Sequence, residues 1–409
     1  MIPPLLKVRQ EIPAPQIKNP GRVLQKGLKR FKGAVKPGQK VAIATGSRGI
    51  NHIGELIKIL ADWVKSQGGK PFIVPAMGSH GASTSEGQKQ VLEKLGISEA
   101  FLKCPVLSEI EAQRIGKVKG VSVYTDCHAR NADHLILINR IKPHTSFHSR
   151  YESGLTKMLA IGLGKRKGAE EIHKFGPGRL GELIPAAAGF LLKKLPVLFG
   201  VALLENFQEN LAGLEVISGS DFLKSEPALL KKAYKLLPRL PFSELEVLII
   251  DRIGKDKSGT GMDTNVIGRL DLRGMKDPSD PRIQRIVALD LSPKTAGSAY
   301  GIGLADITTK RAVDKMDYNS ARENALASTF VERARVPLWF ESDRDAIEAA
   351  ISTCWRPDLK RVRVCRIKST LELDEFWITQ NLLLASKTPL KIIKKSSCLG
   401  FDRKGNLRG

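Results

Sequence analysis

The sequence predicts an α/β protein of two domains, each built on a mainly parallel sheet. Short apolar runs with strand character alternate along the chain with longer segments in which apolar residues recur at helical spacing. This βαβ rhythm is typical of parallel sheets covered by helices. The length of 409 residues, at about 150 residues per domain, fits two or three domains.

The first domain contains most of the recognisable elements. Residues 40–45 and 71–76 are apolar runs that predict buried strands, and the spacing over residues 52–64 predicts a helix between them. Ser83 and Glu86 fit a capping box that opens a helix running through residue 95. Further strands are predicted at 121–125 and 134–139, and further helices at 179–193 and 221–237.

The second domain begins after a proline-rich linker at residues 237–241. We therefore expect an N-terminal α/β domain at residues 1–241 and a C-terminal α/β domain at residues 242–409. Its predicted strands are 245–251 and 286–291, and its predicted helices are 308–315, 321–333 and 343–351. Residues 1–38 and 396–409 are basic and polar and carry no clear pattern.

The chain is strongly basic, with 66 Lys and Arg against 42 Asp and Glu, a formal net charge of +24. Such a charge suits nucleic acid or an anionic small substrate. The basic residues are spread along the chain, with small clusters at 165–167, 231–232 and 360–368, and aromatic residues make up only 6%. In 360–368 basic and apolar residues alternate, which predicts a half-buried strand with a solvated basic face rather than a nucleic-acid groove.

Composition excludes several classes of protein. The apolar fraction of 42% is too high for intrinsic disorder as the main state. The best apolar runs, 184–192 and 196–204, fall short of the roughly 18 residues that a membrane-spanning helix needs. The N-terminus lacks a signal-peptide core, and the five scattered cysteines contain no CxxC pair. We expect a soluble cytoplasmic protein without a membrane partner.

The seven histidines all lie between residues 52 and 173, which indicates a proton-handling or metal-handling region in the first domain. His80 lies in a Gly-Ser-His-Gly turn after a predicted strand, and Arg48 lies in a similar Gly-Ser-Arg-Gly turn. His144 follows a third strand. Loops after parallel strands share one crevice, where an arginine can bind a carboxylate or phosphate. Two histidines on opposite sides of a ligand are what a racemase or epimerase needs. The alternative is that these are unrelated turn residues.

Lys157 lies in an apolar, glycine-flanked run, and His173 follows it sixteen positions later. An apolar setting disfavours the charged form of lysine, so Lys157 is a candidate nucleophile or covalent attachment point. The alternative is a surface lysine whose stem lies on apolar neighbours. His173 is a candidate single metal ligand, with Glu170 as a group that could orient its ring.

In the second domain, glycine-rich loops occupy residues 258–265 and 297–309. Lys294 and Lys310 flank the latter loop, so this region could help to bind an anion. A glycine-rich turn is also common without any ligand.

The ordered set of Arg48, His80 in Gly-Ser-His-Gly, His144 after proline, Lys157 and His173 resembles the nickel-pincer lactate racemase family. The resemblance is most specific over residues 76–173. It implies two α/β domains with an active-site cleft between them. It also implies a nickel complex of a dithio-modified pyridinium mononucleotide as cofactor.

By this resemblance, Lys157 carries the cofactor through a thioamide, and His173 ligates nickel. His80 and His144 are the two general bases, and Arg48 binds the substrate. Lys294 is our choice for the substrate lysine of the second domain. The implied reaction is racemisation or epimerisation of a 2-hydroxy acid, with hydride passing to the cofactor as one histidine takes the hydroxyl proton. The implied partners are the small hydroxy acid and the proteins that make the cofactor.

The sequence departs from lactate racemases in ways that bear on the substrate. The turn before Arg48 and the Gly-Ala-Ser-Thr stretch after His80 differ from the family's pattern, and the segment from 143 to 157 adds His148, Arg150 and Tyr151. These polar groups suggest a larger or more anionic substrate than lactate, such as a sugar acid or a dicarboxylate. Two alternatives stay open: a basic nucleic-acid-binding or scaffold protein, and a metal-dependent hydrolase on the same fold.

Overall fold

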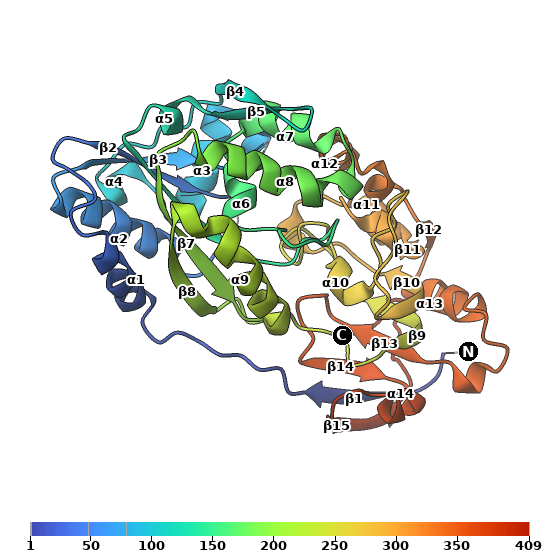
Figure 1. The fold of residues 1–409 in the computed structure, drawn as a ribbon. Helices are drawn as coiled ribbons and strands as arrows, with labels where there is room; N and C mark the ends of the chain where they lie inside the picture. The colour runs from blue at the N-terminus through green and yellow to red at the C-terminus, as the bar shows by residue number, and fades with distance from the viewer. Residues whose placement is uncertain (1, 48, 79, 409) are drawn as a thin grey trace. The chain divides into compact units, whose positions relative to one another are not determined.

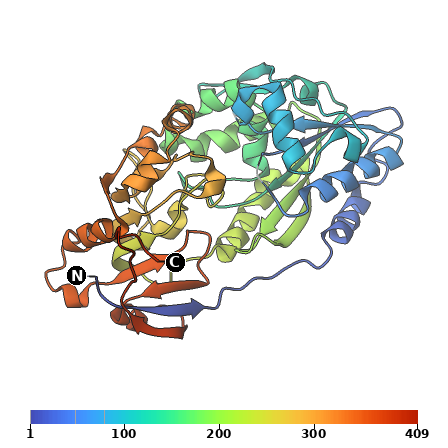
Figure 2. The same cartoon turned by 180° about the vertical axis from the view of Figure 1, so that it is seen from behind.

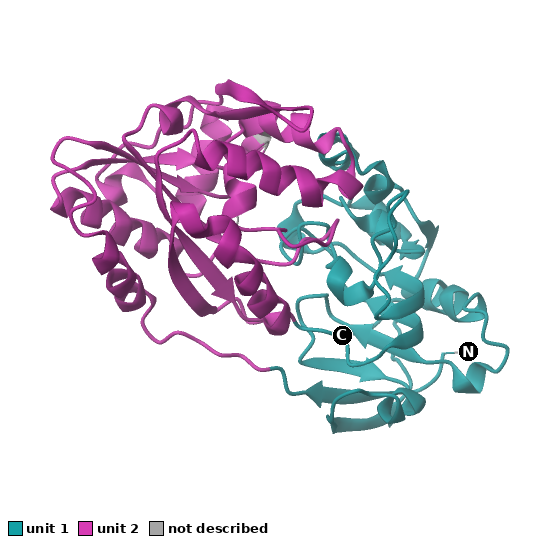
Figure 3. Ribbon diagram, in the orientation of Figure 1, with its two compact units in different colours: residues 1–12, 238–409 teal, residues 13–237 magenta. Residues whose placement is uncertain are grey.

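The computed structural model describes residues 2–47, 49–78 and 80–408, and the chain divides into two compact units (Figure 3). Unit 2 comprises residues 13–237, and unit 1 combines residues 1–12 with residues 238–409. The predicted domains, 1–241 and 242–409, differ from these units in the placement of residues 1–12 and 238–241. Both units combine helices with mostly parallel strands, which confirms the predicted α/β class.

Unit 2 is built on a sheet with the strand order β3-β2-β6-β7-β8 (Figure 1). Only the β7–β8 pair is antiparallel among the described strands of this sheet. The strands of unit 2 are β2 (Lys40–Thr45), β3 (Lys70–Pro75), β6 (His134–Arg140), β7 (Val197–Glu205), β8 (Leu211–Ser218) and the separate hairpin β4 (Ala112–Val118) and β5 (Val121–Asp126). The carboxyl ends of β2, β3 and β6 therefore meet at one edge, where the loops after them gather.

The helices of unit 2 cover both faces of this sheet. They are α1 (Pro20–Leu28), α2 (Ile53–Ser66), α3 (Ser85–Lys94), α4 (Glu99–Leu102), α5 (Cys127–Arg130), α6 (Leu155–Lys157), α7 (Lys165–His173), α8 (Pro177–Leu192) and α9 (Phe222–Leu236). A π-helix, Met158–Gly162, continues α6. The blue helices α1 and α2 lie together on one side of the sheet (Figure 2), and α6 and α9 pack on β7 (Figure 1).

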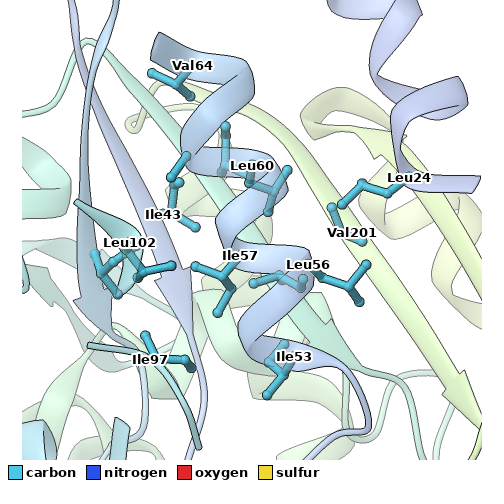
Figure 4. Close-up of a cluster of buried hydrophobic side chains, with 14 of the residues drawn as sticks. Leu24, Ile43, Ile53, Leu56, Ile57, Leu60, Val64, Ile97, Leu102 and Val201 are labelled. Atoms are coloured by element: carbon cyan, nitrogen blue, oxygen red, sulfur yellow. The ribbon is translucent and has the colours of Figure 1, made fainter. Parts of the chain in front are cut away.

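The core between α2 and the sheet follows directly from sequence periodicity. Side chains three and four residues apart on α2 point toward the strands, where they meet Ile43 of β2 and Val201 of β7 (Figure 4). The buried α2 side chains are Ile53, Leu56, Ile57, Leu60, Ala61 and Val64. Burial of this apolar stripe fixes the helix on the sheet and leaves the strand ends free for loops.

Unit 1 has a larger mixed sheet with the strand order β12-β11-β10-β9-β13-β14-β1-β15 (Figure 1). In this order, the first five strands (β12, β11, β10, β9 and β13) pair in parallel. The pairs β13–β14, β14–β1 and β1–β15 are antiparallel. The strands are β1 (Leu5–Gln10), β9 (Glu244–Ile250), β10 (Arg282–Ala288), β11 (Ile307–Thr309), β12 (Leu338–Phe340), β13 (Val364–Ile367), β14 (Glu375–Ile378) and β15 (Leu390–Ser397). The helices are α10 (Thr264–Ile267), α11 (Lys310–Asp314), α12 (Tyr318–Ser328), α13 (Asp343–Ser352) and α14 (Gln380–Leu384).

Several sequence predictions for unit 1 need correction. The segment at 360–368 is not a half-buried strand with a solvated basic face, because β13 is buried throughout. Its Arg366 forms an ion pair of 2.8 Å with Asp251, and the neighbouring Arg363 binds Glu246 at 2.7 Å. The predicted helix at 308–315 begins as strand β11, and the predicted helix at 321–333 ends at Ser328.

The predictions for the two chain ends and for the start of helix α3 also need correction. Residues 1–38 contain β1 and α1, and residues 396–409 begin with the end of β15. Helix α3 is capped by Thr84, whose hydroxyl accepts the Gly87 N–H at 3.0 Å, and not by Ser83. Over the described residues, no helix is both long and apolar enough to cross a membrane.

Candidate functional site

The candidate site lies at the carboxyl edge of the unit 2 sheet. Ser47 follows β2, His80 follows β3, and Asn139 is the last residue but one of β6. The backbone ties the first two loops together, since the Ala76 N–H donates to the Thr45 carbonyl at 2.8 Å. Polar side chains from loops far apart in sequence are thereby brought to one edge.

His80 lies in the loop after β3 and is exposed. Its Nδ1 is hydrogen-bonded to the hydroxyl of Ser47. A serine hydroxyl can either donate or accept a hydrogen bond. The contact therefore orients the ring and is compatible with an Nε2 that carries a proton or one that does not.

A buried polar network holds the His80 loop in place. Gln88 is fully buried and donates to the carbonyls of Gly78 at 3.2 Å and His80 at 3.3 Å. Lys165 is also buried, donates to the Pro75 carbonyl at 2.8 Å, and pairs with buried Asp126 at 2.9 Å. The sequence groups Lys165 with a surface-like basic cluster, but the structure places it beneath the His80 loop.

His144 and Lys157 form the central contact of the site. The Lys157 Nζ lies 2.6 Å from Nε2 of His144. Both side chains are half-buried. The sequence indicated each residue separately, and the structure brings the two together.

The protonation pattern of this contact follows from the other ring nitrogen. The Ser146 N–H donates to Nδ1 of His144 at 3.0 Å, so Nδ1 carries a lone pair. The proton of a neutral imidazole is then on Nε2. An Nε2–H can donate to Lys157 only if the amine is neutral, because an ammonium has no lone pair. A neutral amine at Lys157, which is the nucleophilic form of lysine, could accept this N–H.

Glu152 organises the turn that carries His144. This buried carboxylate accepts the N–H of His144 at 2.6 Å and the N–H of Ser149 at 3.0 Å. It also accepts the hydroxyl of Tyr234 on α9 at 2.8 Å. Tyr234 lies 2.8 Å from Nδ1 of His148 in addition, so His148 belongs to the support of the turn.

The segment that carries Lys157 is held to the end of β6 and to α9. Asn139 donates its amide to the Gly154 carbonyl at 2.9 Å. Glu226 on α9 accepts the Thr156 N–H at 2.9 Å. Burial raises the pKa of Glu226 to about 7, against the opposing effect of the Thr156 N–H. Sequence inspection missed Glu152, Gln88, Lys165 and Glu226, because each acts across a tertiary contact and belongs to no local motif.

His173 is the last residue of α7 and is half-buried. One turn earlier, Ala169 lies near Gly78 of the His80 loop, since a Cβ added at Gly78 would meet the Ala169 Cβ at 3.8 Å, and residues four apart share a helix face. His173 therefore lies on the side of α7 that meets this loop. Glu170, the group expected to orient the His173 ring, is exposed and pairs with Arg166 at 2.7 Å.

Two further residues, Arg48 and Lys294, are predicted to bind the substrate. Arg48 lies outside the described residues. Lys294 is exposed in the 3-10 helix Pro293–Thr295 of unit 1, whereas the histidines and Lys157 belong to unit 2. Within the part of the chain that the structure describes, no group of three or more His, Cys, Asp or Glu side chains is arranged to hold a metal ion.

Unit 2 is thus an α/β domain with a lysine, histidines and buried carboxylates gathered at the carboxyl edge of its sheet. Residues 13–176 match the family described as lactate racemase N-terminal domain. The match over this part of the chain confirms the resemblance noted in the sequence. All four of His80, His144, Lys157 and His173 lie within the matched range.

A solved structure is similar in fold to this chain beyond the matched range. The structure of the lactate racemase apoprotein from Thermoanaerobacterium thermosaccharolyticum is similar over 90% of this chain and 99% of that chain. The TM-score is 0.50 and the sequence identity is 10%, so the likeness concerns the fold. No curated protein sequence is significantly similar to this chain.

Proposed function

We propose that this protein is a racemase or epimerase of a 2-hydroxy acid and that Lys157 carries a nickel-pincer nucleotide. The observation that carries the proposal is the 2.6 Å contact between Lys157 Nζ and His144 Nε2, which favours a neutral, nucleophilic amine. The family match over residues 13–176 supports it. So does the position of these groups at the carboxyl edge of a parallel sheet.

The residues present fit this cofactor. Lys157 offers an amine for covalent attachment, and His173 offers an imidazole nitrogen, a donor that suits nickel. His173 lies on the face of α7 that meets the His80 loop, so ligand and catalytic histidine come from adjoining segments. When bound, the cofactor supplies the acceptor for the α-hydrogen of the substrate.

The two histidines are arranged for opposite proton tasks. His144 presents Nε2–H, because Ser146 occupies Nδ1, and it is therefore prepared as a proton donor. His80 can donate Nδ1–H to Ser47, which leaves its Nε2 as an acceptor for the hydroxyl proton of the substrate. One acceptor and one donor are what a reaction needs when a hydroxyl proton is removed and later returned.

For the substrate, we propose a 2-hydroxy acid with a second polar or anionic group. Tyr151 and His148 serve the fold of the turn, since the Tyr151 hydroxyl donates to the Leu223 carbonyl at 2.6 Å and His148 contacts Tyr234. Arg150 is exposed and remains as the added cation of this segment. Arg48 and Lys294 are the proposed carboxylate-binding residues, because a guanidinium or ammonium binds carboxylates well.

The test uses protein produced together with the enzymes that make the cofactor. A panel of single-enantiomer lactate, sugar acids and hydroxy dicarboxylates is assayed in D2O for a change in optical rotation. We expect racemisation or epimerisation without deuterium at the α-carbon, one nickel per chain, and loss of both activity and adduct in Lys157→Arg. The matched control is Lys174→Arg, which changes an exposed lysine paired with Glu171.

The proposal fails if protein containing nickel and cofactor leaves every member of the panel unchanged. Activity with solvent deuterium at the α-carbon would contradict transfer of the α-hydrogen to the cofactor. Loss of nickel in His173→Ala, with the Lys157 adduct retained, would support the separate roles of the two residues.

A further inference from the structure

Glu226 is a buried carboxyl group that lies outside the matched family domain. It sits on α9, and only 1% of the residue is exposed. Its Oε2 accepts the Thr156 N–H at 2.9 Å. Thr156 directly precedes Lys157 in α6, so the carboxyl lies at the start of the helix that carries the candidate attachment lysine.

Helix α6 receives this acceptor from α9 because its own N-cap residue supplies none. The N-cap position is Gly154, which has no side chain to accept an orphan N–H. A Cβ at Gly154 would lie 2.7 Å from Cδ and from Oε1 of Glu226. The carboxyl group thus fills the space that a side chain at residue 154 would need, and the two residues fit only as a pair.

The same short segment is fixed from its other side. The Gly154 carbonyl accepts the Asn139 amide at 2.9 Å and the Met158 N–H at 3.0 Å. Asn139 lies next to the last residue of β6, so residues 154–158 are held between the sheet edge and α9. The Lys157 side chain leaves this clamped segment toward His144.

We propose that Glu226 is a positioning residue: by accepting the Thr156 N–H it fixes the start of α6 and thereby holds the Lys157 amine against His144 in its neutral form. This inference rests on the proposed function for its purpose, covalent loading of Lys157. Its structural content can be tested without the cofactor. Burial raises the pKa of Glu226 to about 7, so its titration can be followed by NMR near neutral pH.

The experiment measures acetylation of Lys157 by a limiting amount of acetic anhydride in cofactor-free protein, between pH 6 and pH 9. Peptide mass spectrometry reports Lys157 relative to exposed Lys174 in the same sample. Glu226→Met has no acceptor and should lower relative labelling at pH 8 by about tenfold, because a free lysine amine is almost fully protonated there. Its labelling profile should also move to higher pH. Glu226→Gln keeps an acceptor oxygen and should label within about twofold of the wild type.

Circular dichroism shows whether Glu226→Met is folded. If it is not, the wild-type protein supplies the answer through its amide NMR signals. The Thr156 amide should shift as the Glu226 carboxyl titrates and stay constant in Glu226→Gln, while the Met158 amide, bound to Gly154, should move much less.

The proposal is overturned if folded Glu226→Met labels Lys157 at the wild-type rate and with the wild-type pH profile. A Thr156 amide that ignores the carboxyl titration would overturn it as well. Failure of the cofactor to attach to Lys157 would refute the proposed function and leave these results unchanged, so the two failures are distinguishable.

Discussion

Two buried glutamates of unit 2 support neighbouring parts of the site in different ways. Glu152 accepts the N–H groups of His144 and Ser149 and the hydroxyl of Tyr234, at 2.6 to 3.0 Å. Glu226 accepts the Thr156 N–H at 2.9 Å, and its Oε1 lies against Gly154. Burial raises the pKa of Glu226 to about 7.

The comparison shows that two buried carboxyl groups can support a site differently, one through several hydrogen bonds and the other through a single one. Glu152 acts as a fixed hub, because removing it would leave several donors of the His144 turn without an acceptor. Glu226 holds one helix start, and the low polarity around it makes its charge costly. Glu152 therefore accepts several hydrogen bonds of the turn with the candidate proton donor. Glu226 accepts one N–H of the segment with the candidate attachment lysine, and Asn139 holds that segment from its other side.

The largest expected effect comes from removing the Glu152 hub. Glu152→Leu should lower the free energy of unfolding by about 3–5 kcal/mol, since buried donors lose a shared charged acceptor. Urea denaturation followed by circular dichroism measures the change. Glu152→Gln, which keeps one acceptor oxygen, should lose clearly less. Equal and small losses in both variants would show that the turn does not depend on the hub.

The second prediction concerns the pH dependence that Glu226 imposes. Its pKa is about 7 in the folded protein against the ordinary value of 4.5, so the protonated form is favoured by folding. The stabilisation is complete below pH 4.5 and is lost as pH rises to 7, by about 3 kcal/mol in the free energy of unfolding. The difference between wild type and Glu226→Gln, measured by denaturation from pH 4.5 to 8, should follow this curve. Parallel curves for the two proteins would contradict the assignment.

The third prediction tests the fit of Gly154 to Glu226. Gly154→Ala should destabilise the fold by about 1–3 kcal/mol, because the added methyl group meets the carboxyl at 2.7 Å. Gly189→Ala is the matched control: it lies within α8, and its nearest neighbour is a flexible Leu223 methyl at 3.3 Å. We expect the control to be neutral or slightly stabilising in thermal denaturation. Similar losses in both variants would argue against a specific fit at Gly154.

The smallest expected effect tests whether the support from Glu152 is independent of the support from Glu226. Tyr234→Phe removes one donor to Glu152 and should cost about 1 kcal/mol. Acetylation of Lys157 in this variant should remain at the wild-type level, because the start of α6, bound by Glu226, is intact. A strong fall in Lys157 labelling would show that the two supports act as one network.

The sequence predicts local elements well where their pattern is complete within one segment. Strand β2 and helix α2 follow their predicted ranges closely, because a buried apolar run and a helical apolar stripe determine them locally. Strand β13 was misjudged, because Arg366 is buried against Asp251, a partner more than a hundred positions away. Strand β1 lies beside β14 and β15, and such long-range pairing leaves no local signal.

The same limit applies to the site. The candidate site residues stand out by type and setting, as with Lys157 in an apolar run. The 2.6 Å contact with His144 could not be predicted, since it depends on the turn that Glu152 folds. Glu226 and Lys165 look like ordinary surface residues in the sequence, and only tertiary packing shows that they are buried.

The most direct test of the central claim is to locate the cofactor on the chain. Protein produced together with the cofactor-making enzymes is digested, and peptide mass spectrometry identifies the modified lysine. We expect the adduct on Lys157 alone, absent in Lys157→Arg and retained in Lys174→Arg. An adduct on another lysine, or none when a lactate racemase produced in parallel is loaded, would contradict the account.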